Sequence, residues 1–263
     1  EYVDLPKSLM CAGFPIREYD KKIPSNLTAE QILVRSGNIG SVRIVQQVGE
    51  EKFKSFLSKI GILEKIDFDI EEVGKPIKFN WGKCPLATAS FGHGITTTLL
   101  QLAKAYSIVV NGGYQIKPKL VKNNNNEKKE KILSQDLSRE ILPILRKIVS
   151  TKDGTASLAN VNGYEIGGKT GTAEKSADGE YSNKKINSFV SVFPTSKPKF
   201  VLAVMLDEPK INENYIYHYR DGSNIKYKGT PFNTAGWTTV EATGQIVEKI
   251  GPILATKYSE FNF

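Results

Sequence analysis

Cysteine, histidine and long apolar runs are scarce or missing in this 263-residue sequence, and each shortage excludes a class of protein. The two cysteines, Cys11 and Cys84, stand far apart with no C-x-x-C pair and no histidine cluster, so we expect no metal site. Whether these cysteines are free or paired stays open. No stretch of 18 apolar residues is present, and residues 1–11 lack the basic-then-apolar order of a signal peptide.

The sequence begins with Glu1 in place of methionine and opens in the middle of a pattern. We therefore interpret it as a fragment of a longer protein. Any targeting or membrane-spanning segment is expected in the part that precedes Glu1.

Basic residues exceed acidic ones and give a formal net charge of +8. The lysines are dispersed, and the one dense stretch, residues 122–131, mixes both signs around four asparagines. This composition is typical of a solvated loop, and no nucleic-acid recognition motif accompanies it. We expect no nucleic-acid partner.

Helical patterns come first along the chain, after an irregular lead-in expected over residues 1–27. Thr28 and Gln31 have the spacing of a capping box, which predicts the start of a helix. The helical part is expected to cover residues 28–150, with further helices over 39–48, 50–60, 96–110 and 134–149.

Strand patterns follow in the part expected over residues 151–263. The closing helix is expected over residues 237–254, interrupted late at Gly251-Pro252. Helices grouped against an antiparallel sheet make an α+β domain. The three strands are predicted at 164–173, 186–194 and 200–207.

The most informative motif, Lys169-Thr170-Gly171-Thr172, places a lysine and two hydroxyls on a predicted strand. Lys169 supplies positive potential, and Thr170 and Thr172 can hydrogen-bond a carboxylate. Gly171 lets another backbone approach closely, and a strand edge can pair with a peptide. The motif favours an anionic, extended ligand. The plainer alternative is a glycine-rich turn with an exposed lysine.

A second motif, Ser36-Gly37-Asn38, lies at a predicted break between two helices. Turns favour both serine and asparagine, so helix punctuation alone would explain it. The order of the two motifs raises their weight, because Ser-x-Asn between helices followed by Lys-Thr-Gly on a strand occurs in penicillin-binding proteins and class A β-lactamases.

The chain resembles the penicillin-binding protein transpeptidase family, in particular its class B, division-specific members. The resemblance covers residues 25–256 and includes LTAEQILVRSGNIGSVRI, SFGHGITTTLLQLAKAYSIVVNGGYQIKPKLV, GYEIGGKTGTAEK, INSFVSVFP and TAGWTTVEATGQIVEKIGPIL. It implies the C-terminal portion of one transpeptidase domain with the penicillin-binding/β-lactamase-like fold. The fold would be incomplete, because its first two strands and the nucleophile helix are missing.

The resemblance also implies roles for the motif residues. Ser36 would relay a proton toward the leaving amine, and Asn38 would hydrogen-bond the donor peptide. Lys169 would hold the electrostatic and proton network, facing one cleft with Ser36. The terminal carboxylate of a D-Ala-D-Ala stem peptide or of a β-lactam would bind to Thr170, Gly171 and Thr172.

The family's nucleophile motif, Ser-x-x-Lys, is expected ahead of Ser36 and is not found there. Two matches, Ser182-Asn-Lys-Lys185 and Ser196-Lys-Pro-Lys199, follow Lys169 and fall in predicted turns. We expect neither to be the nucleophile, and we expect this chain alone to be inactive.

The resemblance implies a serine-type peptidoglycan D,D-transpeptidase that acts in septal cell-wall synthesis and needs no cofactor. Stem peptides, β-lactams and other cell-division proteins would be its partners. Its place would be the periplasmic face of the bacterial inner membrane, with membrane contact only through the missing N-terminal segment. Two alternatives stay open: a β-lactamase or D,D-carboxypeptidase, and a non-catalytic remnant that binds peptidoglycan or a division partner.

Overall fold

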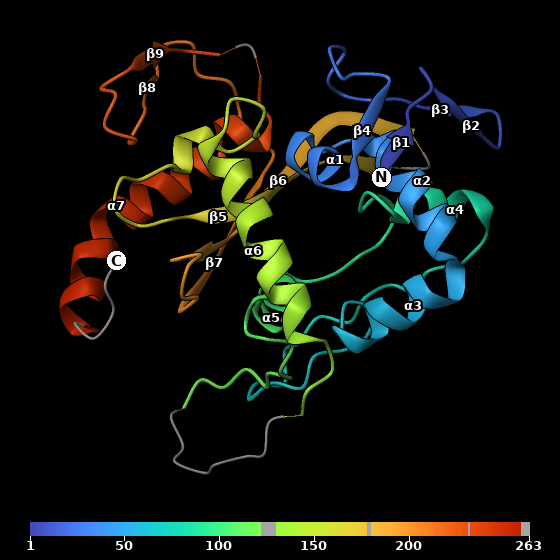
Figure 1. The fold of residues 1–263 in the computed structure, drawn as a ribbon, viewed down its shortest axis with the longest axis horizontal. Coiled ribbons are helices and arrows are strands. Elements are labelled where there is room, and N and C mark those ends of the chain that lie inside the picture. The colour runs from blue at the N-terminus through green and yellow to red at the C-terminus, as the bar shows by residue number, and fades with distance from the viewer. Residues whose placement is uncertain (122–129, 178–179, 231, 259–263) are drawn as a thin grey trace. The chain divides into compact units, whose positions relative to one another are not determined.

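The computed structural model describes residues 1–121, 130–177, 180–230 and 232–258. The chain divides into two compact units, Glu1–Ile141 and Leu142–Phe263, whose elements are labelled in Figure 1. Most of the loop expected over residues 122–131 lies outside the described residues. Among the described helices, none combines the length and apolar character needed to cross a membrane.

Unit 1 opens with four short strands in the segment that we expected to be irregular. Strand β1 (Tyr2–Asp4) pairs with β4 (Asn26–Thr28), and β2 (Leu9–Cys11) pairs with β3 (Phe14–Ile16), both antiparallel. Strands of three residues are too short to show an alternating pattern in the sequence. An apolar cluster orders them, because residues of this segment join helix residues in it: Val3, Leu5, Leu27, Ile32 and Ile39.

Three helices follow at or near the expected positions: α1 (Ala29–Arg35), α2 (Asn38–Val48) and α3 (Glu50–Lys59). The capping box at the start of α1 is confirmed, since the Gln31 N–H donates to Thr28 Oγ1 and the Thr28 N–H donates to Gln31 Oε1. Helix α5 (Leu99–Val110) begins later than expected. Thr98 and Gln101 form a second capping box there, which sets the start of the helix.

Helix α4 (Lys83–Ala89) was not expected. Its Cys84 forms a disulfide with Cys11 at the end of β2, which answers the question that the sequence left open. The bond closes a loop of 73 residues within unit 1. A loop of that length makes the cross-link a substantial constraint on the unfolded chain.

Helix α6 (Gln135–Ser150) begins in unit 1 and ends in unit 2, as the boundary between the units falls within it. The Ser134 hydroxyl accepts a hydrogen bond from the Leu137 N–H at 3.2 Å, so the expected serine cap is present. The helix runs through Pro143.

Unit 2 is built on an antiparallel sheet with the strand order β5-β6-β7. Strand β7 (Phe200–Asp207) has the predicted bounds, whereas β5 (Gly167–Ala177) and β6 (Glu180–Phe193) form a longer hairpin than expected. The extension is polar in sequence and lacks the alternation that marks a strand. The three-stranded antiparallel sheet itself is confirmed in the part of the chain that the structure describes.

Helix α7 (Thr239–Lys257) packs on β6 and β7, as predicted for the closing helix. It does not break at Gly251-Pro252. Gly251 is needed for packing, because a Cβ atom there would lie 2.3 Å from the ring of Tyr164. The helix continues where the sequence predicted an interruption.

A second hairpin, β8 (Ile216–His218) with β9 (Lys226–Lys228), was not predicted and adds to the expected three strands. The Tyr217 side chain of β8 is buried against Trp237, which lies in the short helix η2 (Ala235–Trp237). In the loop between β8 and β9, Arg220 forms a bidentate ion pair with Glu241 of α7, and both side chains are 6% exposed. These contacts fix the hairpin to the start of α7.

Candidate active site

The Ser36-Gly37-Asn38 motif forms the turn between α1 and α2. Gly37 donates its N–H to Ile32 O at 2.8 Å and Ser36 donates to Leu33 O at 3.3 Å, the two bonds of a Schellman motif. Ser36 occupies the position that glycine usually takes, with φ 57° and ψ 45°. A serine in this left-handed conformation is strained, and such strain concentrates at functional sites.

The N-terminus of α2 has no side-chain cap of its own, because its cap residue is Gly37. Glu18 provides the missing acceptor from the segment after β3. Its carboxylate accepts the N–H of Asn38 at 2.6 Å and that of Ile39 at 2.9 Å. The side-chain amide of Asn38 donates to the Arg17 carbonyl at 2.9 Å, and this hydrogen bond orients the Asn38 side chain.

The same segment also contacts the end of α1. Arg35, the residue immediately before Ser36, forms an ion pair with Asp20 at 2.5 Å. The pKa of Asp20 is lowered, first by the hydrogen bond from the Lys22 N–H and then by Arg35, against the opposing effect of burial. Residues 17–20 thus hold the turn from both of its helices.

In unit 2, the Lys169-Thr170-Gly171-Thr172 motif lies on β5, an outer strand of the sheet. The glycines before it are required by close packing. A Cβ atom at Gly167 would lie 2.9 Å from the Arg146 backbone nitrogen of α6, and one at Gly168 would lie 2.5 Å from the Val190 carbonyl. Any larger residue at either position would displace the strand that carries the motif.

Lys169 is half-buried, and its ammonium group donates to the Thr170 carbonyl at 3.0 Å. Burial lowers the pKa of Lys169 to about 8, because removal from water disfavours the charged form. An amine with such a pKa exchanges protons near neutral pH, which an exposed lysine does not.

The two threonines of the motif each have a hydroxyl partner within unit 2. Thr170 Oγ1 lies 2.8 Å from Thr155 Oγ1, and either group can donate in this pair. Thr172 Oγ1 accepts the N–H of Ala235 at 3.0 Å, while the Thr172 side chain is exposed. Both hydroxyls are therefore held at defined positions along β5.

Arg146 of α6 secures the start of β5. Its guanidinium donates to the Ile166 carbonyl at 2.7 Å and to Asn160 Oδ1 at 2.8 Å. Burial lowers the pKa of this arginine, and the nearby Glu165 charge partly offsets the effect. The backbone that leads into the lysine motif is thus fixed by a cation from the neighbouring helix.

The penicillin binding protein transpeptidase domain model matches residues 4–224. This chain belongs to that family. It is 29% identical over 88% of its length to a probable peptidoglycan D,D-transpeptidase FtsI of Caulobacter vibrioides, and 33% identical over 68% to the stage V sporulation protein D of Bacillus subtilis. It covers 39% and 30% of those two proteins.

Solved structures agree on the fold. The apo transpeptidase domain of penicillin-binding protein 3 from Burkholderia pseudomallei matches with a TM-score of 0.80 at 25% identity. The match covers 96% of this chain and 72% of that one. The α+β fold expected for a penicillin-binding transpeptidase is therefore confirmed.

The Ser-x-x-Lys matches of this family member do not lie on a helix, where the family's nucleophile motif is expected. Ser182 lies on β6, where residues i and i+3 point to opposite faces, and its hydroxyl donates to the Lys175 carbonyl. The Ser196 hydroxyl binds the Glu165 carboxylate in the turn after β6. A third match, absent from the predictions, is Ser223-Asn-Ile-Lys226, which begins in the exposed loop between β8 and β9 and ends at the first residue of β9.

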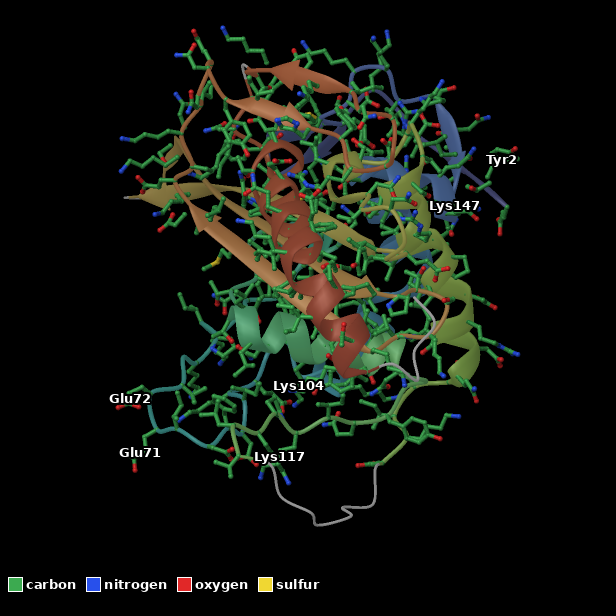
Figure 2. The ribbon with its side chains drawn as sticks, turned by 90° about the vertical axis from the view of Figure 1, so that its left-hand side faces the viewer. Tyr2, Glu71, Glu72, Lys104, Lys117 and Lys147 are labelled. Carbon is green, nitrogen blue, oxygen red and sulfur yellow. A yellow bond between two sulfur atoms is a disulfide. The ribbon has the colours of Figure 1, made fainter. Side chains whose placement is uncertain are left out.

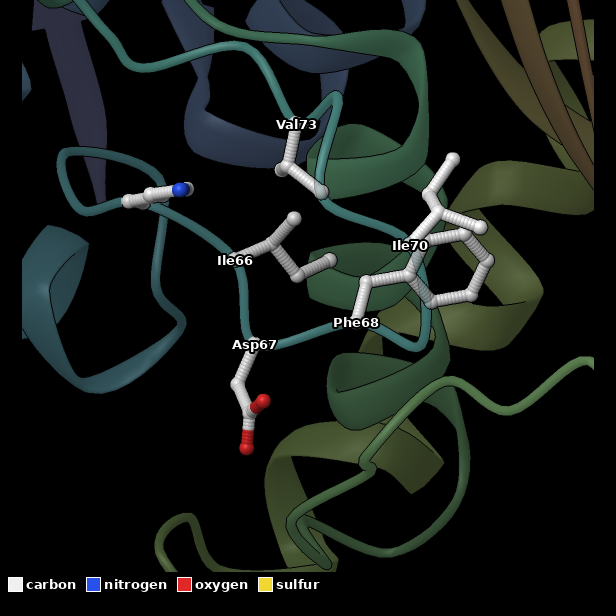
Figure 3. Close-up of a pocket in the computed structure, with 6 residues that line it drawn as sticks. Ile66, Asp67, Phe68, Ile70 and Val73 are labelled. Atoms are coloured by element: carbon white, nitrogen blue, oxygen red, sulfur yellow. The ribbon is translucent and has the colours of Figure 1, made fainter.

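Outside the two motifs, unit 1 contains a pocket of about 340 Å³ along residues 65–73 (Figure 3). Ile66, Phe68 and Val73 give it an apolar lining, and Asp67 pairs with Lys117 at 2.6 Å. None of the motif residues of this penicillin-binding family member lines it. Within the described ranges, no three His, Cys, Asp or Glu side chains gather to hold a metal ion.

Sequence reasoning missed Glu18, Arg146 and Thr155. One signal was available for Glu18: a glycine N-cap leaves the α2 amides without an acceptor, so a carboxylate must come from elsewhere. Arg146 and Thr155 carry no such signal, because only the fold brings them to β5. The predicted common cleft of Ser36 and Lys169 stays a prediction, since the two residues belong to different units.

Proposed function

We propose that this chain is the stem-peptide-binding part of a serine-type peptidoglycan D,D-transpeptidase of the class B, division-specific kind, and that it binds β-lactams. The observation that carries the proposal is the Lys169-Thr170-Gly171-Thr172 motif on an outer strand, in a chain of the penicillin-binding protein transpeptidase family. An outer strand presents unpaired main-chain groups, to which an extended peptide adds as a further strand.

The hydroxyl geometry supports recognition of a terminal carboxylate. Thr170 and Thr155 share one hydroxyl hydrogen in their mutual bond, so the second hydrogen of the pair remains available to a ligand. Thr172 acts as acceptor toward Ala235, so its own hydrogen also remains available. Two O–H donors at the motif, one from the Thr155/Thr170 pair and one from Thr172, suit an ionised carboxylate, which can only accept.

Lys169 supplies charge and proton exchange beside these donors. With a pKa of about 8, roughly a tenth of the lysine is neutral at pH 7. In the proposed reaction, Lys169 stabilises the anionic substrate and takes part in the proton network, Ser36 relays a proton toward the leaving amine, and Asn38 hydrogen-bonds the donor peptide.

The attacking serine of the proposed reaction belongs to a Ser-x-x-Lys motif that the printed sequence does not contain ahead of Ser36. The chain by itself therefore positions ligands without forming an acyl-enzyme. A periplasmic location is part of the proposal, and the Cys11–Cys84 disulfide supports it, because such bonds persist in oxidising compartments.

The test is an NMR titration of the chain with an N-acetylated peptide that ends in D-Ala-D-Ala. We expect binding that the L-Ala-L-Ala peptide does not reproduce. Thr172→Val should weaken it about tenfold, because a hydrogen bond to a charged group is lost. Thr172→Ser should restore most of the affinity, and Thr256→Val, at an exposed threonine of α7, serves as the matched control.

Equal binding of both peptides, or full binding by Thr172→Val, would contradict the proposal. A second measurement addresses the nucleophile: incubation with a fluorescent penicillin, followed by denaturing electrophoresis and intact mass, should give no covalent adduct. A stoichiometric adduct that disappears on substitution by alanine would show that this chain is a complete enzyme, with the nucleophile among Ser36, Ser182, Ser196 and Ser223.

A further inference from the structure

We propose that Glu18 is a positioning residue for the Ser36-Gly37-Asn38 turn, an inference that rests on the role proposed for that turn above. Glu18 lies outside both motifs, in a segment that the sequence analysis treated as irregular. Its carboxylate nevertheless accepts the first two N–H groups of α2, those of Asn38 and Ile39, at 2.6 and 2.9 Å.

The chemistry of a helix N-terminus explains why this contact is strong. The first N–H groups of a helix have no partner within the helix and carry a partial positive charge, so a carboxylate satisfies both needs at once. Gly37, the N-cap residue, has no side chain to do this. A Cβ atom added at Gly37 would lie 3.5 Å from Glu18 Oε1, so the carboxylate also packs directly against the turn.

The segment that carries Glu18 is itself held at several points. Ile16 and Ile23, on either side of it, pack on the apolar cluster that contains Ile32 of α1 and Ile39 of α2. Asp20 pairs with Arg35, and the hairpin before the segment is joined to α4 by the disulfide. The segment that carries Glu18 is therefore anchored on both sides, and this anchoring fixes the position from which Glu18 contacts α2.

The consequence concerns both functional side chains of the turn. Glu18 fixes the backbone of Asn38, while the neighbouring Arg17 carbonyl fixes the Asn38 amide and leaves its second N–H to donate elsewhere. Ser36 lies two residues before Asn38, and its backbone is in a strained left-handed conformation. The contacts around the turn must maintain this conformation. Without the carboxylate, the start of α2 frays and the orientation of Asn38 is lost.

The test compares Glu18→Gln, Glu18→Ala and Glu18→Asp with the unchanged 263-residue chain by amide hydrogen exchange and two-dimensional NMR. Glu72→Gln is the matched control, because Glu72, labelled in Figure 2, is an exposed carboxylate in a loop of the same unit and forms no hydrogen bond to the turn in the described structure. We expect exchange at the Asn38 and Ile39 amides to rise at least tenfold in Glu18→Ala, with a smaller rise in Glu18→Gln and partial rescue in Glu18→Asp.

The Asn38 side-chain amide signals should shift in the same order, whereas a general contribution of Glu18 to the stability of unit 1 would shift signals throughout the unit. Unchanged exchange at Asn38 and Ile39 in Glu18→Ala would overturn the proposal. So would an equal loss of protection in α3, for example at Leu57, because Glu18 would then stabilise the unit as a whole.

The exchange measurement needs no ligand, so it stands or falls separately from the proposed function. In a chain that binds the D-Ala-D-Ala peptide, Glu18→Ala should also weaken binding about tenfold while Glu72→Gln leaves it unchanged. If the unchanged chain does not bind the peptide, the proposed function fails, and the exchange rates alone decide whether Glu18 positions the turn.

Discussion

Replacing Ser36 by glycine should stabilise unit 1 although it removes the hydroxyl to which the proposed function assigns a proton relay. Ser36 adopts φ 57° and ψ 45° at the end of α1, a conformation that costs an L-amino acid about 1–2 kcal/mol relative to glycine. Glycine in turn loses about 0.4–1 kcal/mol through the greater freedom of the unfolded chain. The difference predicts a gain of about 0.5–1 kcal/mol in the free energy of unfolding.

Ser36→Ala separates the backbone effect from the loss of the hydroxyl. Alanine keeps the Cβ atom and therefore the strain, so the difference between the glycine and alanine variants reports the strain at φ less the extra freedom of glycine in the unfolded chain. We expect Ser36→Gly to be more stable than Ser36→Ala by about 1 kcal/mol. Under the proposed function, both variants lose the proton relay, so stability and activity move in opposite directions in the glycine variant.

Urea unfolding followed by tryptophan fluorescence measures the difference. Trp81 lies against the Leu57 cluster of unit 1, and Trp237 lies in unit 2. A Trp237→Phe background therefore makes the signal specific to unit 1, and all variants are compared in it. An alanine variant as stable as the glycine variant would refute the claim that the turn is strained at Ser36.

Three further predictions concern buried groups. Below pH 8, Lys169→Met should be more stable than the unchanged chain by on the order of 1–3 kcal/mol. This difference in the free energy of unfolding should disappear between pH 8 and 10.5, because Lys169 stays protonated there only in the unfolded chain. Urea unfolding across this pH range measures the difference. Cys84→Ser should cost unit 1 about 4 kcal/mol by opening the loop closed by Cys11, seen as faster amide exchange there but not in unit 2. Glu241→Gln should cost unit 2 about 3–5 kcal/mol in urea unfolding, because Arg220 is left buried with its charge partly uncompensated.

The Glu241 contribution also has a predictable pH dependence. Burial raises the pKa of Glu241, but the hydrogen bonds from Arg220 and Gln245 and the charge of Arg220 outweigh burial, so the pKa is lowered overall. The stabilisation is therefore complete above the ordinary carboxyl pKa of 4.5 and is lost as the pH falls below it. In Glu241→Gln, this acid-dependent loss should be absent.

Local signals in the sequence were sufficient wherever an element is determined by its own residues. The capping box at Thr28 and the continuous apolar run of β7 predicted α1 and β7 closely, because both signals act over a few positions. The start of α5 was wrong although Thr98 and Gln101 have the same capping spacing, since three consecutive threonines offered several candidate caps.

Elements determined by distant contacts could not be predicted. The strands of residues 1–27 depend on an apolar cluster shared with Ile32 and Ile39, and β8 and β9 depend on packing against Trp237. At Gly251 of α7, Tyr164 packs closely against the helix from far away in the sequence, so the absence of a side chain there serves a tertiary contact. In each case a tertiary contact overrides a local preference.

The two motifs were recognisable from sequence because their residue types and order match those of a known family, and two of these residues are unfavourable for stability where they lie. Glycine would be the less strained residue at position 36, and an apolar side chain would avoid the penalty of a half-buried amine at position 169. Ser36 and Lys169 are thus positions where local rules of stability are broken, which is expected where function determines the residue. Glu18, Thr155 and Arg146 follow the ordinary rules of stability, because each supplies a hydrogen-bond partner. Glu18 binds the first N–H groups of α2, Thr155 binds the Thr170 hydroxyl, and Arg146 binds the Ile166 carbonyl. Supporting residues of this kind leave little trace in a single sequence, because satisfying a polar group is what most polar residues do.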